Sequence, residues 1–278
     1  MLNPKKVRHV LRLLMVTSIF FANSANASSA MEGESEIEPA AKIALITGAN
    51  KGIGKEIARG LGLKGFTVLV GSRDEKNGEA VVSEFKKENI QAHAVPLEVT
   101  NEASILSAAQ WIDWRFGKLN VLVNNAGIIP DYSKPSESDI ELVRRVYETN
   151  VFAPIRLIQA FLPLLKKSEA GRIVNMSSGL GSLTQASDPS WEHYPVNVLG
   201  YCTSKTALNA VTVHFAKELR GTSIKINSAD PGYCATDLTG HSGLRTPEQG
   251  AIAAIRLATL SAEGPSGKFF DEEGSVDW

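Results

Sequence analysis

The stretch KIALITGANKGIG, residues 42–54, decides the fold. Its first six residues form a short apolar run of the kind that makes a strand buried on both faces of a parallel sheet. Gly48, Gly52 and Gly54 follow, and a helical pattern begins at Gly52. Glycines here permit a tight turn and let the backbone approach a pyrophosphate, which the positive end of a helix attracts. The G-x-x-x-G-x-G spacing alone is equally compatible with a simple strand-to-helix turn.

Apolar runs and helical patterns alternate from this stretch to the C-terminus. Strands are expected at residues 42–47, 66–70, 91–97, 119–124, 173–177, 223–228 and 268–270. Helices are expected at 52–64, 75–88, 101–116, 138–167, 201–219 and 247–260, and Pro154 and Pro163 are expected to bend or break the fourth. This alternation predicts an α/β fold: a single doubly wound Rossmann-type domain with a mostly parallel seven-stranded sheet, over residues 42–278. Such sheets bind ligands beyond the carboxyl ends of their strands.

The first 41 residues differ from the rest in composition. Basic residues precede an apolar run at 13–22, and Ala25-Asn26-Ala27 matches a cleavage pattern, so residues 1–27 are predicted to be a signal peptide. Residues 28–41 read as an acidic linker; the alternative is an extension upstream of a start at Met31. The apolar run is shorter than the about 20 residues that span a bilayer, so no stable membrane anchor is expected. The protein is expected to be exported or periplasmic if the signal functions, and cytoplasmic otherwise.

Composition narrows the class of partner. The 278 residues include 29 Lys and Arg against 30 Asp and Glu, a formal net charge of -1, which gives no support for nucleic acid as a partner. Cys202 and Cys234 are the only cysteines, and their spacing fits neither a disulfide framework nor a metal site. The expected partner is therefore a small molecule, and no metal is predicted.

A second stretch, residues 177–205, carries candidate chemistry. It follows an expected strand with Ser177-Ser178 and ends at Tyr201 and Lys205, which lie one helical turn apart on the same face. A free phenol, with a pKa near 10, is a poor proton donor and acceptor at neutral pH, and a nearby ammonium group favours its ionised form. Tyr201 with Lys205 therefore predicts proton transfer to a carbonyl oxygen.

The motifs Thr47-Gly-x-x-x-Gly-x-Gly, 124–127 (NNAG), Tyr201-x-x-x-Lys205 and Pro231-Gly232 together resemble the short-chain dehydrogenase/reductase family over nearly all of residues 42–278. The longer insert at 179–200 and Asn50-Lys51 in the glycine turn look like its carbonyl reductase branch. Trp191, His193 and Tyr194 in that insert either wall a substrate pocket or pack as an ordinary surface loop.

This resemblance implies four catalytic residues. Tyr201 would be the general acid, and Lys205 would support it and bind the nicotinamide ribose. Ser178 would hydrogen-bond the substrate oxygen; the family pattern places the active hydroxyl second in the Ser177-Ser178 pair. Asn150 would order a proton-relay water behind the lysine.

The resemblance also implies the cofactor site. Arg73 follows the second strand, where an acidic residue would bind the ribose of NAD, so Arg73 and Lys51 favour the 2′-phosphate of NADPH (NADP+). Glu98-Val99 stands where the family has Asp-Val against the adenine, and one extra methylene moves that acceptor. The expected cofactor-binding residues are Gly48, Asn50, Lys51, Gly52, Ile53, Gly54, Arg73, Glu98, Val99, Asn125, Ala126, Gly127, Tyr201, Lys205, Pro231, Gly232 and Thr236.

The expected activity is hydride transfer from NADPH to a ketone, aldehyde or quinone carbonyl, with Tyr201 as general acid. The alternatives are an NAD(P)-dependent secondary alcohol dehydrogenase and a non-catalytic dinucleotide-binding sensor. The substrate is a small carbonyl compound or alcohol, and the family resemblance implies a homodimer or homotetramer. The sequence does not determine the individual substrate or the direction of the reaction.

Overall fold

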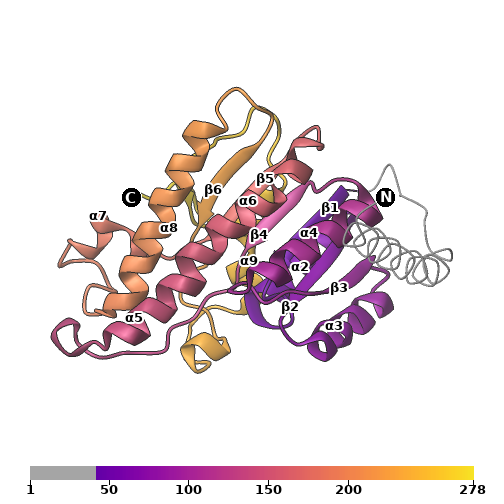
Figure 1. The fold of residues 1–278 in the computed structure, drawn as a ribbon. Helices are drawn as coiled ribbons and strands as arrows, with labels where there is room; N and C mark the ends of the chain where they lie inside the picture. The colour runs from indigo at the N-terminus through magenta and orange to yellow at the C-terminus, as the bar shows by residue number, and fades with distance from the viewer. Residues whose placement is uncertain (1–41) are drawn as a thin grey trace, which may run out of the picture. The chain divides into compact units, whose positions relative to one another are not determined.

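The computed structural model describes residues 42–278, which form a seven-stranded sheet with helices on both faces (Figure 1). The strand order is β3-β2-β1-β4-β5-β6-β7, and every neighbouring pair is parallel. The predicted single doubly wound Rossmann-type domain is confirmed, and its sheet is parallel throughout. The strands are β1 (Lys42–Thr47), β2 (Phe66–Ser72), β3 (Ala92–Pro96), β4 (Val121–Asn124), β5 (Arg172–Met176), β6 (Lys225–Ala229) and β7 (Phe269–Phe270).

The helices divide between two apolar cores, one on each face of the sheet. On one face the core includes α4 (Glu102–Phe116) and α6 (Ala153–Lys166), and α8 (Leu199–Glu218) packs against it. On the other face α2 (Gly52–Leu63), α3 (Glu75–Lys87) and α9 (Pro247–Ala258) cover the sheet. Four residues of β1, Ile43 to Ile46, have no exposed surface, as expected for a strand between two helical layers.

Side-chain caps start α3, α4 and α9, and the predicted boundaries of these helices lie within two residues of the observed ones. The Asp74 carboxylate accepts a hydrogen bond from the Asn77 N–H at the start of α3 (2.9 Å). Asn101 caps α4 in the same way, through the N–H of Ser104 (3.0 Å). Thr246 and Gln249 form a capping box around the start of α9.

The long helix expected at 138–167 is interrupted next to its first proline. It consists of α5 (Ile140–Tyr147), a π-helical segment η2 (Glu148–Phe152) and α6. Pro154 lies just after η2, in the first turn of α6, and the backbone stays helical at Phe152, so the missing N–H and the ring of Pro154 act on the turn that contains Asn150; Pro163 lies inside α6. The helix is interrupted at η2, which carries Asn150, and π-helical turns are frequent at functional sites.

The insert before Tyr201 has structure of its own. Two short helices, η3 (Gly179–Gly181) and α7 (Leu183–Ala186), precede α8. The C-terminus holds this region, because the Ser182 hydroxyl donates to the carbonyl of Asp277 (2.7 Å) and the Thr184 N–H donates to that of Trp278 (2.9 Å). The predicted signal peptide and the linker lie outside the described residues. Within residues 42–278, no helix has both the length and the apolar character to cross a membrane.

Candidate active site

The glycine turn after β1 requires residues without a side chain. Gly48 and Gly52 adopt left-handed backbone conformations, with φ of 64° and 55°. A Cβ atom on Gly48 would lie 3.2 Å from the Cα atom of Ala126, so a side chain at this position would crowd the turn after β4. The turn therefore keeps a bare backbone surface at the N-terminus of α2, which suits a pyrophosphate.

Thr47 ties this turn to the one after β4. Its hydroxyl accepts hydrogen bonds from the N–H groups of Asn125 and Ala126, both at 3.0 Å. The Asn125 amide in turn donates to the carbonyl of Thr47 (2.8 Å). Thr47 belongs to the glycine motif, but no role was predicted for it. A hydroxyl at the end of a strand could have indicated one, because such groups commonly form hydrogen bonds with nearby backbone.

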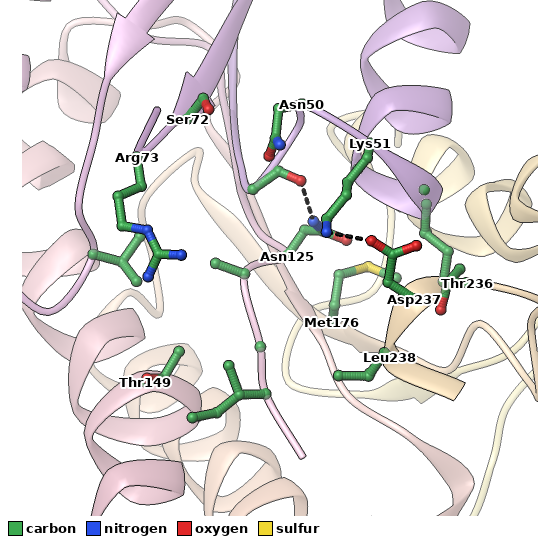
Figure 2. A pocket seen from close by; sticks show the side chains of 18 of the residues that line it. Asn50, Lys51, Ser72, Arg73, Asn125, Thr149, Met176, Thr236, Asp237 and Leu238 are labelled. Carbon is green, nitrogen blue, oxygen red and sulfur yellow. Dashed lines mark hydrogen bonds and ion pairs between the residues drawn. The ribbon is translucent and has the colours of Figure 1, made fainter. Parts of the chain in front are cut away.

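A cavity of about 1030 Å³ opens at the carboxyl ends of the strands. It is lined by every predicted cofactor-binding residue except Gly232, and Tyr201 and Lys205 are among them. Figure 2 shows Arg73 and Lys51 on different sides of it. Residues that line it but were not predicted include Ser72, Asn77, Thr149, Met176 and Leu238. Within residues 42–278, no group of three or more His, Cys, Asp or Glu side chains is placed to hold a metal ion.

Lys205 is almost completely buried, with 4% of its surface exposed. Its ammonium group donates to the carbonyl of Met176 at the end of β5 (2.7 Å) and lies 5.5 Å from the centre of the Tyr201 ring. Burial lowers the pKa of Lys205 to about 8, and the negative charge of Asp230 opposes this effect.

Tyr201 is buried as well, and burial raises the pKa of its phenol above the ordinary value, opposite in direction to the predicted effect of Lys205. A hydrogen bond with the Ser178 hydroxyl acts in the opposite sense and lowers it. The ionisation of this tyrosine therefore depends on how strongly neighbouring groups stabilise the phenolate.

The structure separates the two adjacent serines. The Ser178 hydroxyl accepts from the N–H of Leu180 (3.2 Å), and its interaction with the phenol lowers the pKa of Tyr201. Ser177 is buried, and its hydroxyl faces the carbonyl of Lys205 (3.5 Å). Ser178 is therefore the serine whose hydroxyl contacts the tyrosine.

Asn150 fixes the loop that follows β4. Its side-chain oxygen accepts from the N–H of Ile128 (3.0 Å), and its amide donates to the carbonyl of the same residue (3.1 Å) and to Ser204 (3.1 Å). A Cβ atom on Gly127 would lie 3.5 Å from that oxygen and 3.6 Å from the Lys205 nitrogen. Asn150 and Lys205 thus approach the same glycine from η2 and α8.

Charged side chains surround the far end of the cavity. The Arg73 guanidinium lies 3.6 Å from the carboxylate of Glu98, whose other oxygen accepts from the hydroxyl of Thr100 (2.9 Å). Glu98 is thus held by these contacts, while Asp74 is occupied as the cap of α3. Lys51 pairs with Asp237 (Figure 2).

The loop after β6 closes another side of the cavity. Pro231 and Thr236 line the cavity, whereas Gly232 lies behind it, where a Cβ atom would meet Arg245 at 2.6 Å. Asp237 joins this loop to the glycine turn through Lys51.

Three comparisons identify relatives of this chain. A family model described as short chain dehydrogenase matches residues 42–245. The chain is 35% identical to short-chain dehydrogenase anuI of Penicillium roqueforti, over 84% of this chain and 95% of the relative. It is 32% identical to (+)-neomenthol dehydrogenase of Arabidopsis thaliana, over 85% and 98%. The crystal structure of NADPH-bound carbonyl reductase from chicken fatty liver shares 30% identity and a TM-score of 0.74, over 85% and 98% of the two chains. The chain belongs to the short-chain dehydrogenase/reductase family, in which it resembles the carbonyl reductases.

Proposed function

We propose that this oxidoreductase transfers hydride from NADPH to the carbonyl group of a ketone, aldehyde or quinone. The observation that carries this proposal is the convergence of Ser178, Tyr201 and Lys205 beside a cavity that also reaches the glycine turn. Bound NADPH would supply the hydride. The bare backbone at Gly48 fits a pyrophosphate, because a Cβ atom there would crowd Ala126.

Each side chain has a separate task in the proton transfer. Tyr201 donates a proton to the carbonyl oxygen as the carbon becomes tetrahedral. Ser178 donates a hydrogen bond to the same oxygen and stabilises its developing charge. Lys205, when protonated, lowers the free energy of the phenolate that remains on Tyr201. Asn150 holds the loop behind Lys205. A water molecule ordered there would relay a proton back toward Lys205 and Tyr201.

The preference for NADPH rests on the end of β2. Arg73 is the residue there whose planar guanidinium matches a phosphate, and its pairing with Glu98 keeps it at the cavity. Asp74, the nearest carboxylate, is engaged by the N–H of Asn77 and is less available to a ribose hydroxyl. Lys51 is hydrogen-bonded to Asp237, whereas Arg73 lies 3.6 Å from Glu98 without a hydrogen bond to it, so Arg73 is the freer of the two to pair with a phosphate. The chicken carbonyl reductase, which was crystallised with NADPH, supports this choice.

The experiment is to follow the loss of NADPH absorbance by the full chain with a panel of aldehydes, ketones and quinones, with NADH in parallel. We expect turnover with NADPH to exceed that with NADH. Preference for NADH would overturn the cofactor assignment and leave the chemistry in place. Tight cofactor binding without turnover of any carbonyl would favour the non-catalytic sensor.

The reverse reaction is the second candidate. The same residues would oxidise a secondary alcohol with NADP+, and the relative named (+)-neomenthol dehydrogenase favours testing it. Incubating the full chain with NADP+ and a panel of secondary alcohols measures this activity. A higher kcat/KM for the alcohols than for the carbonyls would reverse the proposed direction.

Two further properties belong to the proposal. Ile140 in α5 and Phe152 in η2, the π-helical segment that carries Asn150, are exposed, which supports a homodimer or homotetramer through this surface. Sedimentation of the full chain measures its mass in solution.

Export is tested by sequencing the mature N-terminus, where Ser28 would indicate cleavage.

A further inference from the structure

Asp230, which directly follows β6, has no task in the mechanism above. Its carboxylate accepts a hydrogen bond from the N–H of Gly232 (2.9 Å), and the N–H of Gly179 also lowers its pKa. The second carboxylate oxygen lies 3.0 Å from the position that a Cβ atom on Gly179 would occupy. Asp230 therefore joins the loop after β6 to the turn after β5.

That turn carries Ser178. On one side of Ser178, the N–H of Ser177 donates to the carbonyl of Ala229 (2.7 Å); on the other, Gly179 lies against the Asp230 carboxylate. The N–H of Asp230 is itself bonded to the β7 strand (2.7 Å to the Phe270 carbonyl). The backbone around Ser178 is thus held from both sides by β6, and this sets where the serine hydroxyl meets the Tyr201 phenol.

We propose that Asp230 is a positioning residue of the reductase site, whose carboxylate holds the Ser178–Gly179 turn against the Pro231–Gly232 loop and keeps the Ser178 hydroxyl beside the Tyr201 phenol. This inference rests on the proposed function. Asp230 acts through Ser178 and through its charge, and it does not touch the reacting carbonyl.

The charge of Asp230 gives the inference a second, independent readout. Its carboxylate raises the pKa of Lys205 against the effect of burial, and it also raises the pKa of Tyr201. Burial raises the pKa of Asp230 itself, Asp271 after β7 raises it further, and Arg245 in the loop before α9 lowers it. Replacing Asp230 with a neutral side chain therefore lowers the pKa of Lys205, so that the lysine loses its proton at lower pH.

The central test compares Asp230→Asn with wild type in the full chain. We expect kcat to fall about tenfold or more, because misplaced catalytic groups lose rate steeply, while the KM for NADPH stays within about twofold. The alkaline limb of the kcat profile should move to lower pH. The matched control is Asp188→Asn, since Asp188 bonds to Ser190 in the insert near the same turn and should leave both quantities unchanged.

Gly179→Ala separates position from charge. The added methyl group would lie 3.0 Å from the Asp230 carboxylate and displace it without removing its charge. We expect kcat to fall in this variant while the alkaline limb stays in place. Wild-type kcat in both Asp230→Asn and Gly179→Ala would overturn the positioning role, and an unmoved limb in Asp230→Asn would overturn the electrostatic one.

A measurement on the cofactor-free protein keeps this inference distinct from the proposed function. The Lys205 titration can be followed by NMR of ¹³C-labelled lysine, with Lys205→Arg used to assign the signal. We expect it to shift to lower pH in Asp230→Asn. A wild-type chain without turnover would overturn the proposed function, yet an unshifted titration would still contradict the coupling of Asp230 to Lys205.

Discussion

The two ends of the cavity are built differently. At the proposed cofactor end, the glycine turn presents bare backbone to the cavity, and the charged side chains of Lys51 and Arg73 are 63% and 82% exposed. At the chemical end, Asn150, Lys205 and Tyr201 are only 1%, 4% and 8% exposed. Replacing an exposed charge such as Arg73 changes the stability of the fold little and mainly affects ligand affinity. Lys205, the buried charge at the chemical end, is held in place by its bond to the carbonyl of Met176, and keeping it charged costs stability.

Tyr201→Phe should separate the two ends most clearly, because it should affect catalysis and leave cofactor binding intact. We expect kcat to fall by a factor of about 10²–10⁴, the usual contribution of a positioned general acid, with NADPH binding retained. Tyr194→Phe is the matched control, since Tyr194 does not line the cavity and 47% of its surface is exposed. Steady-state kinetics and NADPH fluorescence titration measure the two effects. Full turnover by the Tyr201 variant would remove it from the proton path.

Lys205 should also make stability depend on pH. Its folded pKa of about 8 lies below the ordinary value of 10.5, so between these values the unfolded chain binds more protons. The free energy of unfolding should therefore rise with pH across this window, by about 3 kcal/mol for this group. Denaturant unfolding of wild type and Lys205→Met at several pH values isolates the term by difference. A difference that does not vary with pH would contradict it.

At the cofactor end, Arg73→Gln tests recognition of the 2′-phosphate. Loss of a charge-assisted hydrogen bond costs about 1.5–3 kcal/mol, so the KM for NADPH should rise about 10- to 100-fold while that for NADH stays unchanged. Arg144→Gln is the control, because Arg144 pairs only with nearby Glu141 in the surface contacts described. An equal rise for both cofactors would mean that Arg73 does not read the phosphate.

The smallest effect is expected from backbone strain. Gly48→Ala and Gly65→Ala both place an alanine at positive φ (64° and 82°), which costs about 1 kcal/mol each. An added Cβ atom on Gly65 would have open space around it, whereas one on Gly48 would lie 3.2 Å from the Cα atom of Ala126. Thermal unfolding should show similar losses with a small excess for Gly48, and only Gly48→Ala should weaken NADPH binding. Equal NADPH affinity in the two variants would argue against the glycine turn as the pyrophosphate site.

Sequence reasoning recovered the elements whose signals are local. The apolar run of β1 was predicted with its observed ends, and caps at Asp74 and Asn101 account for the starts of α3 and α4. The break expected at Pro154 lies at η2, the π-helical turn just before that proline, whereas Pro163 does not interrupt α6. A π-helical turn is stabilised by what surrounds it, in this case bonds from Asn150 to Ile128 and Ser204, and such contacts leave no periodic signal.

The sequence alone indicated the family, the doubly wound α/β fold and the residues of the candidate site, because the alternating apolar runs, the glycine turn and the Tyr201–Lys205 spacing are local patterns. Only the tertiary structure showed that Lys51 and Arg73 have carboxylate partners and that burial raises the pKa of Tyr201. It also revealed Asp230, whose carboxylate lies against Gly179 at the end of a different strand. Burial and charge coupling depend on distances between segments remote in sequence, and these exist only once the sheet has assembled.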